Sequence, residues 1–270
     1  MTMRAEYWAV VALVGLMITP DAEAETVRLY AAGSLRGTLG EVIAAYAATS
    51  GDTVQPKFGA SGLLKDEIAG GAKAEVFTSA NMGHPQALAR ENRAGPVVLF
   101  ARNRLCALAR PGLAVDPTTL LDRMLDPEVK LGTSTPRADP SGDYAWEVFR
   151  KAEAVRPGAY ARLDAKALQL VGGPSSQPPP EGRTIYSVLI ERGAADIFLA
   201  YCTDARAALK ESPGQQVITL PDALAVGADY GLTVITGAPP SAYRCALFIL
   251  SPQGQQILEK HGFNAPNLPQ

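Results

Sequence analysis

The sequence predicts an α/β protein of two lobes, each a mostly parallel sheet flanked by helices, with a ligand cleft between them. Short apolar strands alternate with amphipathic helices along most of the 270-residue chain, and this alternation is typical of parallel sheets. One strand, residues 97–109, is longer than the others and has a polar centre, Arg102-Asn103-Arg104. A strand that crosses from one lobe to the other would have this pattern.

The first 24 residues have the pattern of a cleavable signal peptide. Arg4 supplies positive charge, residues 8–18 are apolar, and Ala22-Glu23-Ala24 is an A-x-A cleavage site. The apolar run is shorter than the roughly 18 residues that a membrane-spanning helix needs. We therefore expect export and a mature chain starting near Glu25. No cysteine near the cleavage site offers a lipid anchor, which favours the periplasm.

The composition indicates a protein with a sizeable core and no affinity for nucleic acid. Hydrophobic residues make up 47% of the chain, and the formal net charge is −2 with no basic run. Nucleic-acid phosphates need clustered Lys and Arg. The three cysteines, Cys106, Cys202 and Cys245, lie in apolar stretches, which favours burial. An oxidising compartment permits one disulfide, but the spacing does not choose the pair.

Three strand and helix units are expected before residue 91. They are strands 27–31, 53–58 and 74–80, each followed by a helical pattern, at 35–46, 63–68 and 84–90. Ser34 and Ser61 stand where the first two strands give way to helices. We expect Ser34 to be an N-cap, and Ser61 to have an equivalent position. Both would then lie at the carboxyl edge of the sheet, where such sheets bind ligands.

A second set of elements follows the long strand. It comprises strands 130–135, 196–202 and 216–220 and helices 118–125, 142–154, 186–192 and 205–211, before a strand at 230–236 and a closing helix at 242–261. Ser141 is the third serine at a helix start. The Pro-rich segment 174–180 is expected to be an exposed loop. We assign residues 25–102 and 223–270 to lobe 1 and residues 103–222 to lobe 2.

The sequence contains few signatures of catalysis, and we expect no enzyme. The serines lack the G-x-S-x-G pattern, and the P-loop and dinucleotide-binding glycine patterns are absent from the sequence. No group of His, Cys, Asp and Glu has the spacing of metal ligands. The sequence therefore predicts no cofactor and no site for a free metal ion.

The three serines at helix starts, two in one lobe and one in the other, instead predict a site for a small oxyanion. A helix N-terminus offers N–H groups without intrahelical partners, so a negative charge can be held without a buried cation. Each hydrogen bond to a charged acceptor contributes roughly 1.5 to 3 kcal/mol. About five such bonds would support micromolar or tighter binding.

Over residues 27–263 the sequence resembles the periplasmic molybdate-binding proteins of ABC transporters, which have the type II periplasmic binding-protein fold. The order and spacing of five segments carry the resemblance. These are Tyr30-Ala31-Ala32-Gly33-Ser34-Leu35, Phe58-Gly59-Ala60-Ser61, and residues 74–80, 139–145 and 251–263. The resemblance implies a protein, expected to be a monomer, that delivers molybdate or tungstate to the membrane permease of an ABC importer.

The resemblance also implies which residues bind the oxyanion. Ser34 and Ser61 match two serines that bind it, and Ser141 matches a backbone amide that does so. Arg183 aligns with a position whose backbone amide binds the oxyanion, and Tyr201 aligns with a tyrosine whose hydroxyl binds it. The same positions allow a different interpretation, in which the serines are structural caps and Tyr201 is a tyrosine at the edge of the core.

Two positions depart from the family pattern and leave alternatives open. Arg183 stands where the family has a small apolar residue, and a guanidinium in the pocket would favour a carboxylate or a more highly charged anion. Asp139 resembles an acidic residue that contacts the metal centre in archaeal molybdate and tungstate relatives, but it also suits a turn. The alternatives are the same fold binding another anion or a small organic acid, an enzyme using Asp139 or Cys202, and a partner-docking protein using loop 174–180.

Overall fold

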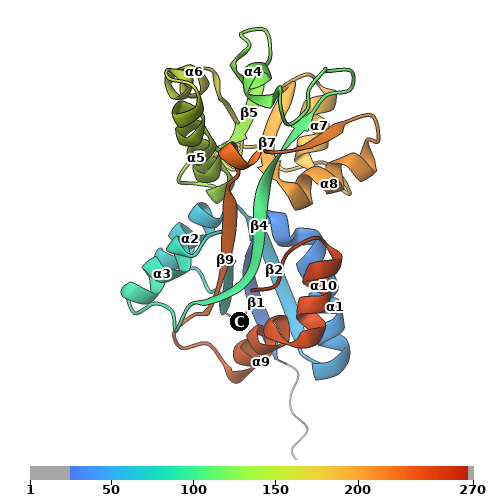
Figure 1. Cartoon of the computed structure of the whole chain (residues 1–270). Coiled ribbons are helices and arrows are strands. Elements are labelled where there is room, and N and C mark those ends of the chain that lie inside the picture. Colours follow the sequence, from blue (N-terminus) through green and yellow to red (C-terminus); the bar gives the residue numbers. More distant parts are fainter. Residues whose placement is uncertain (1–24, 267–270) are drawn as a thin grey trace, which may run out of the picture.

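Two α/β lobes form the part of the chain that the structure describes, residues 25–266 of a computed structural model (Figure 1). The predicted signal peptide lies outside these residues. The strand order is β2-β1-β3-β9-β4-β7-β5-β6, and β8 also pairs with β4. The predicted two-lobed fold is therefore confirmed. Within residues 25–266, no helix combines the length and the apolar character that a bilayer span requires.

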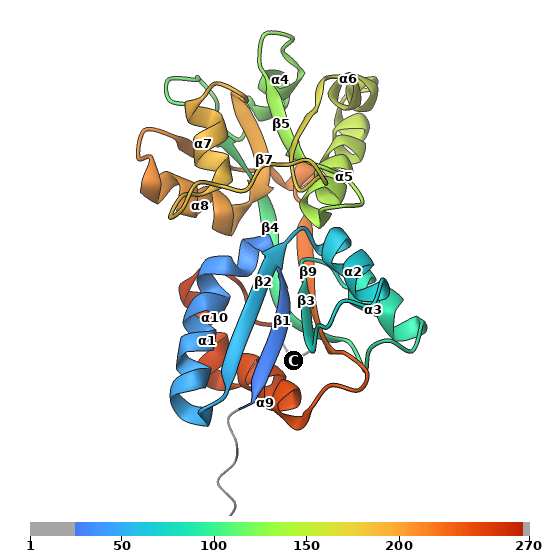
Figure 2. The same ribbon diagram turned by 180° about the vertical axis from the view of Figure 1, so that it is seen from behind.

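Lobe 1 is a sheet with helices on both faces. Its elements are β1 (Thr26–Ala32), a 3-10 turn (Gly33–Leu35), α1 (Arg36–Ser50), β2 (Thr53–Gly59), α2 (Ser61–Ala69), β3 (Val76–Ser79), α3 (Gly83–Arg90), β9 (Gly227–Val234), α9 (Pro240–Leu250) and α10 (Pro252–Lys260). Strand β1 pairs in parallel with β2 and β3, whereas β9 is antiparallel to β3. Helices α2 and α3 cover one face, and α1, α9 and α10 cover the other (Figures 1 and 2).

Lobe 2 repeats this arrangement. Its elements are α4 (Leu120–Leu125), β5 (Leu131–Ser134), α5 (Pro140–Val155), α6 (Ala159–Lys166), β6 (Leu168–Val171), α7 (Ile185–Glu191), β7 (Ile197–Tyr201), α8 (Cys202–Glu211), β8 (Gln216–Thr219) and a 3-10 turn (Asp222–Leu224). Strand β5 pairs in parallel with β6 and β7. Helix α6 and strand β6 are not in the sequence prediction. Strand β6 has only four residues and is half exposed, so its sequence pattern is too short to mark a strand.

Strand β4 (Val98–Ala109) belongs to both lobes. Residues 98–104 pair with β9, residues 105–109 pair with β7, and residues 106–109 also pair with β8. All of these pairings are antiparallel, so each lobe has a mixed sheet. The pairing partner changes directly after the polar centre Arg102-Asn103-Arg104, as expected for a crossing strand.

The predicted closing helix 242–261 is wrong, because the segment forms two helices, α9 and α10. Ser251 has a ψ of 160°, outside the helical region. The next residue, Pro252, disfavours helical backbone before it and has no N–H to donate. The Ser251 hydroxyl instead accepts a hydrogen bond from the Gly254 N–H (3.2 Å) and caps α10.

One disulfide joins Cys106 of β4 to Cys202, the first residue of α8. Cys245 of α9 stays a buried free thiol. The bond attaches the crossing strand to the helix that begins where β7 ends. It therefore stabilises the part of lobe 2 that lies nearest to lobe 1.

Candidate ligand-binding site

Ser34 and Ser61 lie at the carboxyl ends of β1 and β2, as predicted, but neither is an N-cap. A 3-10 turn follows β1, so α1 begins only at Arg36 and is capped by Leu35. Ser61 is the first residue of α2 rather than its cap. Both hydroxyl groups are therefore free to make contacts outside their own helices.

The hydroxyls of these two serines bond to distant strands. Ser34 Oγ and Tyr230 Oη of β9 share a hydrogen bond of 2.9 Å. Ser61 Oγ accepts a bond of 3.1 Å from the N–H of Ala80, just after β3. Long-range contacts thus hold both side chains at the edge of lobe 1 that faces lobe 2.

At the start of α5, Asp139 is the N-cap and Ser141 is not. Asp139 Oδ1 accepts a hydrogen bond of 3.0 Å from the Ser141 N–H, and Pro140 occupies the first helical position. The resemblance implies that the Ser141 N–H binds the ligand, but in this structure it is already hydrogen-bonded to Asp139. The Ser141 hydroxyl is fully buried and has no hydrogen-bond partner among the described residues.

Three tyrosines connect the lobes around these serines. Tyr201, the last residue of β7, packs against Tyr144 of α5 and Tyr230 of β9, with ring centroids 6.3 and 5.6 Å away. Tyr144 Oη donates to the carbonyl of Ala80 (3.3 Å), the residue whose N–H bonds Ser61. A continuous series of contacts therefore leads from Ser61 through the tyrosines to Ser34.

The Tyr201 hydroxyl is a buried donor without an acceptor. Tyr201 is 2% exposed, and no described residue hydrogen-bonds its Oη. Burial holds the pKa of Tyr201 well above its usual value, so the hydroxyl keeps its proton. Buried polar groups are nearly always hydrogen-bonded. The unpartnered hydroxyls of Tyr201 and Ser141 are therefore suited to an acceptor such as an oxyanion.

The two lobes touch beside the serines. The N–H of Gly62, the residue after Ser61, donates to the carbonyl of Ala138 (2.8 Å), three residues before Ser141. A Cβ on Gly62 would lie 2.3 Å from the carbonyl oxygen of Arg137 and 2.7 Å from that of Ala138. The contact sets the starts of α2 and α5 against each other, and it has no room for a side chain.

Sequence analysis missed several residues of this region. Asn103, in the polar centre of β4, donates to Thr203 Oγ1 of α8 (2.9 Å) and to Tyr230 Oη (3.5 Å). The polar break in an apolar strand was a readable signal for Asn103. Tyr230 and Tyr144 carry no such signal, because aromatic residues are common in strands and on apolar helix faces.

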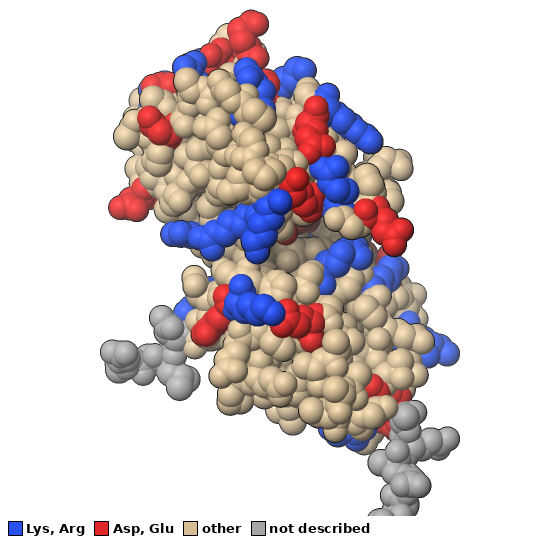
Figure 3. All heavy atoms as spheres, turned by 90° about the vertical axis from the view of Figure 1, so that its right-hand side faces the viewer, with Lys and Arg blue, Asp and Glu red and all other residues tan. Residues whose placement is uncertain are grey.

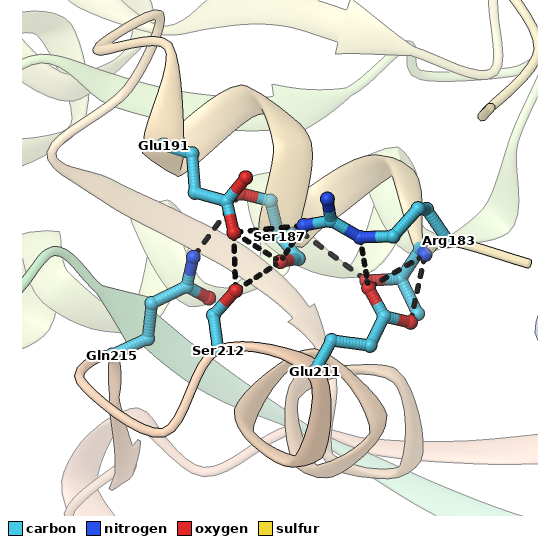
Figure 4. Close-up of polar contacts among 7 residues, drawn as sticks. Arg183, Ser187, Glu191, Glu211, Ser212 and Gln215 are labelled. Carbon is cyan, nitrogen blue, oxygen red and sulfur yellow. Dashed lines mark hydrogen bonds and ion pairs between the residues drawn. The ribbon is translucent and has the colours of Figure 1, made fainter.

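The structure does not bring Arg183 together with the other predicted ligand residues. Its guanidinium forms ion pairs with Glu191 (2.7 Å) and Glu211 (3.1 Å), and it donates to Ser187 Oγ (3.0 Å) (Figure 4). Its backbone N–H donates to the carbonyl of Pro180 (3.1 Å). Its donors are thus occupied within lobe 2, and we leave Arg183 out of the proposed ligand set.

The surface beside the site carries charges of both signs. Lys and Arg side chains lie on both sides of the hollow between the lobes, with Asp and Glu side chains among them (Figure 3). Within residues 25–266, no group of three or more His, Cys, Asp and Glu could hold a metal ion.

Known proteins resemble this chain over most of its length. An uncharacterized protein of Pasteurella multocida (strain Pm70), PM1146, is 33% identical over 241 residues, which are 89% of this chain and 99% of that protein. The molybdate-binding protein ModA of Rhodobacter capsulatus is 27% identical over 266 residues, 97% of this chain and 96% of that protein.

A solved structure and a family model extend these similarities. The periplasmic molybdate-binding protein of Azotobacter vinelandii matches with a TM-score of 0.71 at 20% identity, covering 89% of this chain and all of that chain. This match confirms the type II periplasmic binding-protein fold, and the similarity to the Rhodobacter capsulatus protein confirms the resemblance to molybdate-binding proteins. A family model described as bacterial extracellular solute-binding protein matches residues 27–264. The chain therefore belongs to the family of bacterial extracellular solute-binding proteins.

Proposed function

We propose that this protein binds molybdate or tungstate in the periplasm and delivers it to the membrane permease of an ABC importer. The observation that carries the proposal is the pair of buried, unpartnered hydroxyls, Ser141 Oγ at the start of α5 and Tyr201 Oη at the end of β7. The similarity to the Rhodobacter capsulatus molybdate-binding protein supports this choice of ligand.

The proposed ligand set is neutral. Ser34 and Ser61 come from lobe 1, and Ser141 and Tyr201 come from lobe 2. None of these side chains is charged, so the anion would be held by oriented donors rather than by a counter-ion. The Ser141 N–H can bind the anion only after its present hydrogen bond to Asp139 Oδ1 (3.0 Å) breaks.

In the proposed mechanism, the lobes close around the anion by hinge motion. The hinges are residues 102–104 of β4 and the return crossing at residues 220–226. The two lobes are residues 25–102 with 223–270, and residues 103–222. The hydrogen bond from Gly62 to Ala138 and that from Tyr144 to Ala80 would form on closure, because each joins one lobe to the other.

Titration calorimetry tests this function. Ligand-stripped mature protein should bind one molybdate or tungstate per chain with micromolar or tighter affinity, and sulfate or phosphate should not displace it. Folded protein that takes up neither oxyanion at any concentration used would refute the proposal.

Removing one donor should weaken the binding of molybdate without unfolding the protein. Ser61→Ala and Tyr201→Phe each delete one hydrogen bond to a charged acceptor, for a loss of roughly 10- to 150-fold in affinity. Ser50→Ala and Tyr243→Phe are matched controls, because Ser50 and Tyr243 are exposed and lie in α1 and α9. Equal losses in the controls would show that the effect is not local to the site.

Arg183→Ala separates the proposed ligand from the alternative of another anion or a small organic acid. Because Glu191 and Glu211 already neutralise the guanidinium, molybdate affinity should change by less than about twofold, as expected for a residue with no ligand contact. Calorimetry on the variant measures this. A loss of tenfold or more would place Arg183 in the pocket and favour the alternative.

A further inference from the structure

Asp204 places a carboxyl group without a partner beside the proposed site. It lies in the first turn of α8, three residues after Tyr201 and next to Thr203, which bonds Asn103. The residue is half-buried, but its Oδ2 is buried and has no hydrogen-bond partner in residues 25–266. An ionised carboxylate in such a place is costly unless it is paired.

Asp139 is a second, half-buried carboxyl group whose charge acts on Asp204. It caps α5 through the Ser141 N–H, and a Cβ on Gly172 would lie only 2.5 Å from its Cβ and Oδ2. Neither Asp139 nor Asp204 forms an ion pair within the described chain. Burial and the Asp139 charge raise the pKa of Asp204 to about 7. Burial also raises the pKa of Asp139, to about 6.

The other titratable groups around Asp204 do not supply a positive charge. The Asp204 charge acts on Tyr186 of α7 and Tyr230 of β9, and the elements around it also carry Tyr201 of β7, Arg104 of β4, Arg206 of α8 and Glu191 of α7. Burial raises the pKa of all three tyrosines well above the usual value, so they stay neutral. The two arginines are exposed, Glu191 is paired with Arg183, and β8 has no charged residue.

We propose that Asp204 couples anion capture to the uptake of one proton, so that the site binds the dianion together with a protonated Asp204 carboxyl. A dianion held by Ser141 and Tyr201 would be repelled by an ionised Asp204, whereas the protonated acid has an O–H to donate. The proton comes from solvent, adds to the Asp204 carboxylate when the anion enters, and returns to solvent when it leaves. This inference rests on the proposed function.

The direction of the pH dependence follows from this coupling. The bound dianion raises the pKa of Asp204 above its ligand-free value of about 7. Below that pH the carboxyl is already protonated, and affinity is constant. Above it, affinity for molybdate falls by up to about tenfold per pH unit, the limit for one proton per anion. Molybdate itself stays a dianion over this range, so its own titration adds nothing.

Titration calorimetry tests the coupling. Molybdate is titrated into the protein at several pH values from about 6 to about 9, in two buffers of different ionisation enthalpy. The difference in heat between the buffers gives the number of protons taken up per anion. Wild-type protein should take up close to one proton per anion at the alkaline end, with affinity falling there. Asp204→Asn should lose most of this uptake at the alkaline end, because the remaining carboxyl, Asp139, has the lower pKa, about 6. Asp122→Asn, at an exposed position in α4, should keep the wild-type pH profile.

The possible results test the role of Asp204 and the proposed function separately. Tight molybdate binding by wild-type protein with no proton uptake overturns the role of Asp204 and leaves the proposed function in place. A wild-type pH profile in Asp204→Asn also overturns it. If Asp204→Asn does not fold, the proton count of the wild-type protein decides alone. Absence of binding at every pH overturns the proposed function itself.

Discussion

Gly62→Ala should weaken molybdate binding by roughly 5- to 150-fold, because a methyl group at this position prevents the lobes from closing. The added Cβ would lie 2.3 Å from the Arg137 carbonyl oxygen, a backbone atom of the opposite lobe. Forcing a methyl group into a filled contact costs about 1 to 3 kcal/mol, which corresponds to that range of affinity. Titration calorimetry measures the loss.

The matched control for this variant is Gly40→Ala. Gly40 lies in α1, and a Cβ there would meet no atom within 4 Å. Alanine is also the better helix former, so Gly40→Ala should fold and bind molybdate as the wild-type protein does. Gly62→Ala should keep the wild-type melting temperature without ligand if its lobes open. Wild-type affinity in Gly62→Ala would show that the contact between Gly62 and Ala138 is not part of the bound state.

Removal of the disulfide should cause the largest loss of stability. The double variant Cys106→Ala/Cys202→Ala opens a loop with a sequence separation of 96 residues. Loss of a native disulfide costs about 2 to 5 kcal/mol, in part because the unfolded chain regains freedom. For a chain of this size we expect a fall in Tm of roughly 4 to 20 °C.

Urea unfolding under non-reducing conditions compares the double variant with the wild-type protein. Reducing agent should destabilise the wild-type protein and leave the double variant unchanged. Cys245→Ala serves as the control, because Cys245 is buried but unpaired, and its response to reducing agent should match that of the wild type. Identical unfolding midpoints for wild type and double variant would mean that the bond does not form.

The positions of Ser34 and Ser61 could be predicted from local sequence, but their contacts could not. A strand that ends in small residues before a helical pattern correctly places Ser34 and Ser61 at the edge of the sheet. The capping role of Ser34 is wrong because its hydroxyl bonds Tyr230, 196 residues away. A local pattern does not contain so distant a partner. By contrast, Asp139 followed by Pro140 does indicate a helix start in the sequence, because Asp favours the N-cap and Pro favours the first helical position.

The errors in secondary structure have similar physical causes. The break between α9 and α10 was readable, since Pro252 ends the preceding helix. Strand β6 was not, because it is short and half exposed and pairs only with β5. The pairing of Cys106 with Cys202 also depends on tertiary structure. It needs β4 and the start of α8 to be neighbours, which only the folded sheet provides.

The shared strand β4 couples the unfolding of one lobe to the unfolding of the other. One uninterrupted strand supplies residues 98–104 to one sheet and residues 105–109 to the other. If either lobe unfolded alone, half of β4 would lose its partners while the other half stayed paired. We therefore expect neither lobe to fold independently, although each has its own sheet. We expect both to melt in one cooperative transition, and amide hydrogens on the two halves of β4 to exchange at similar rates.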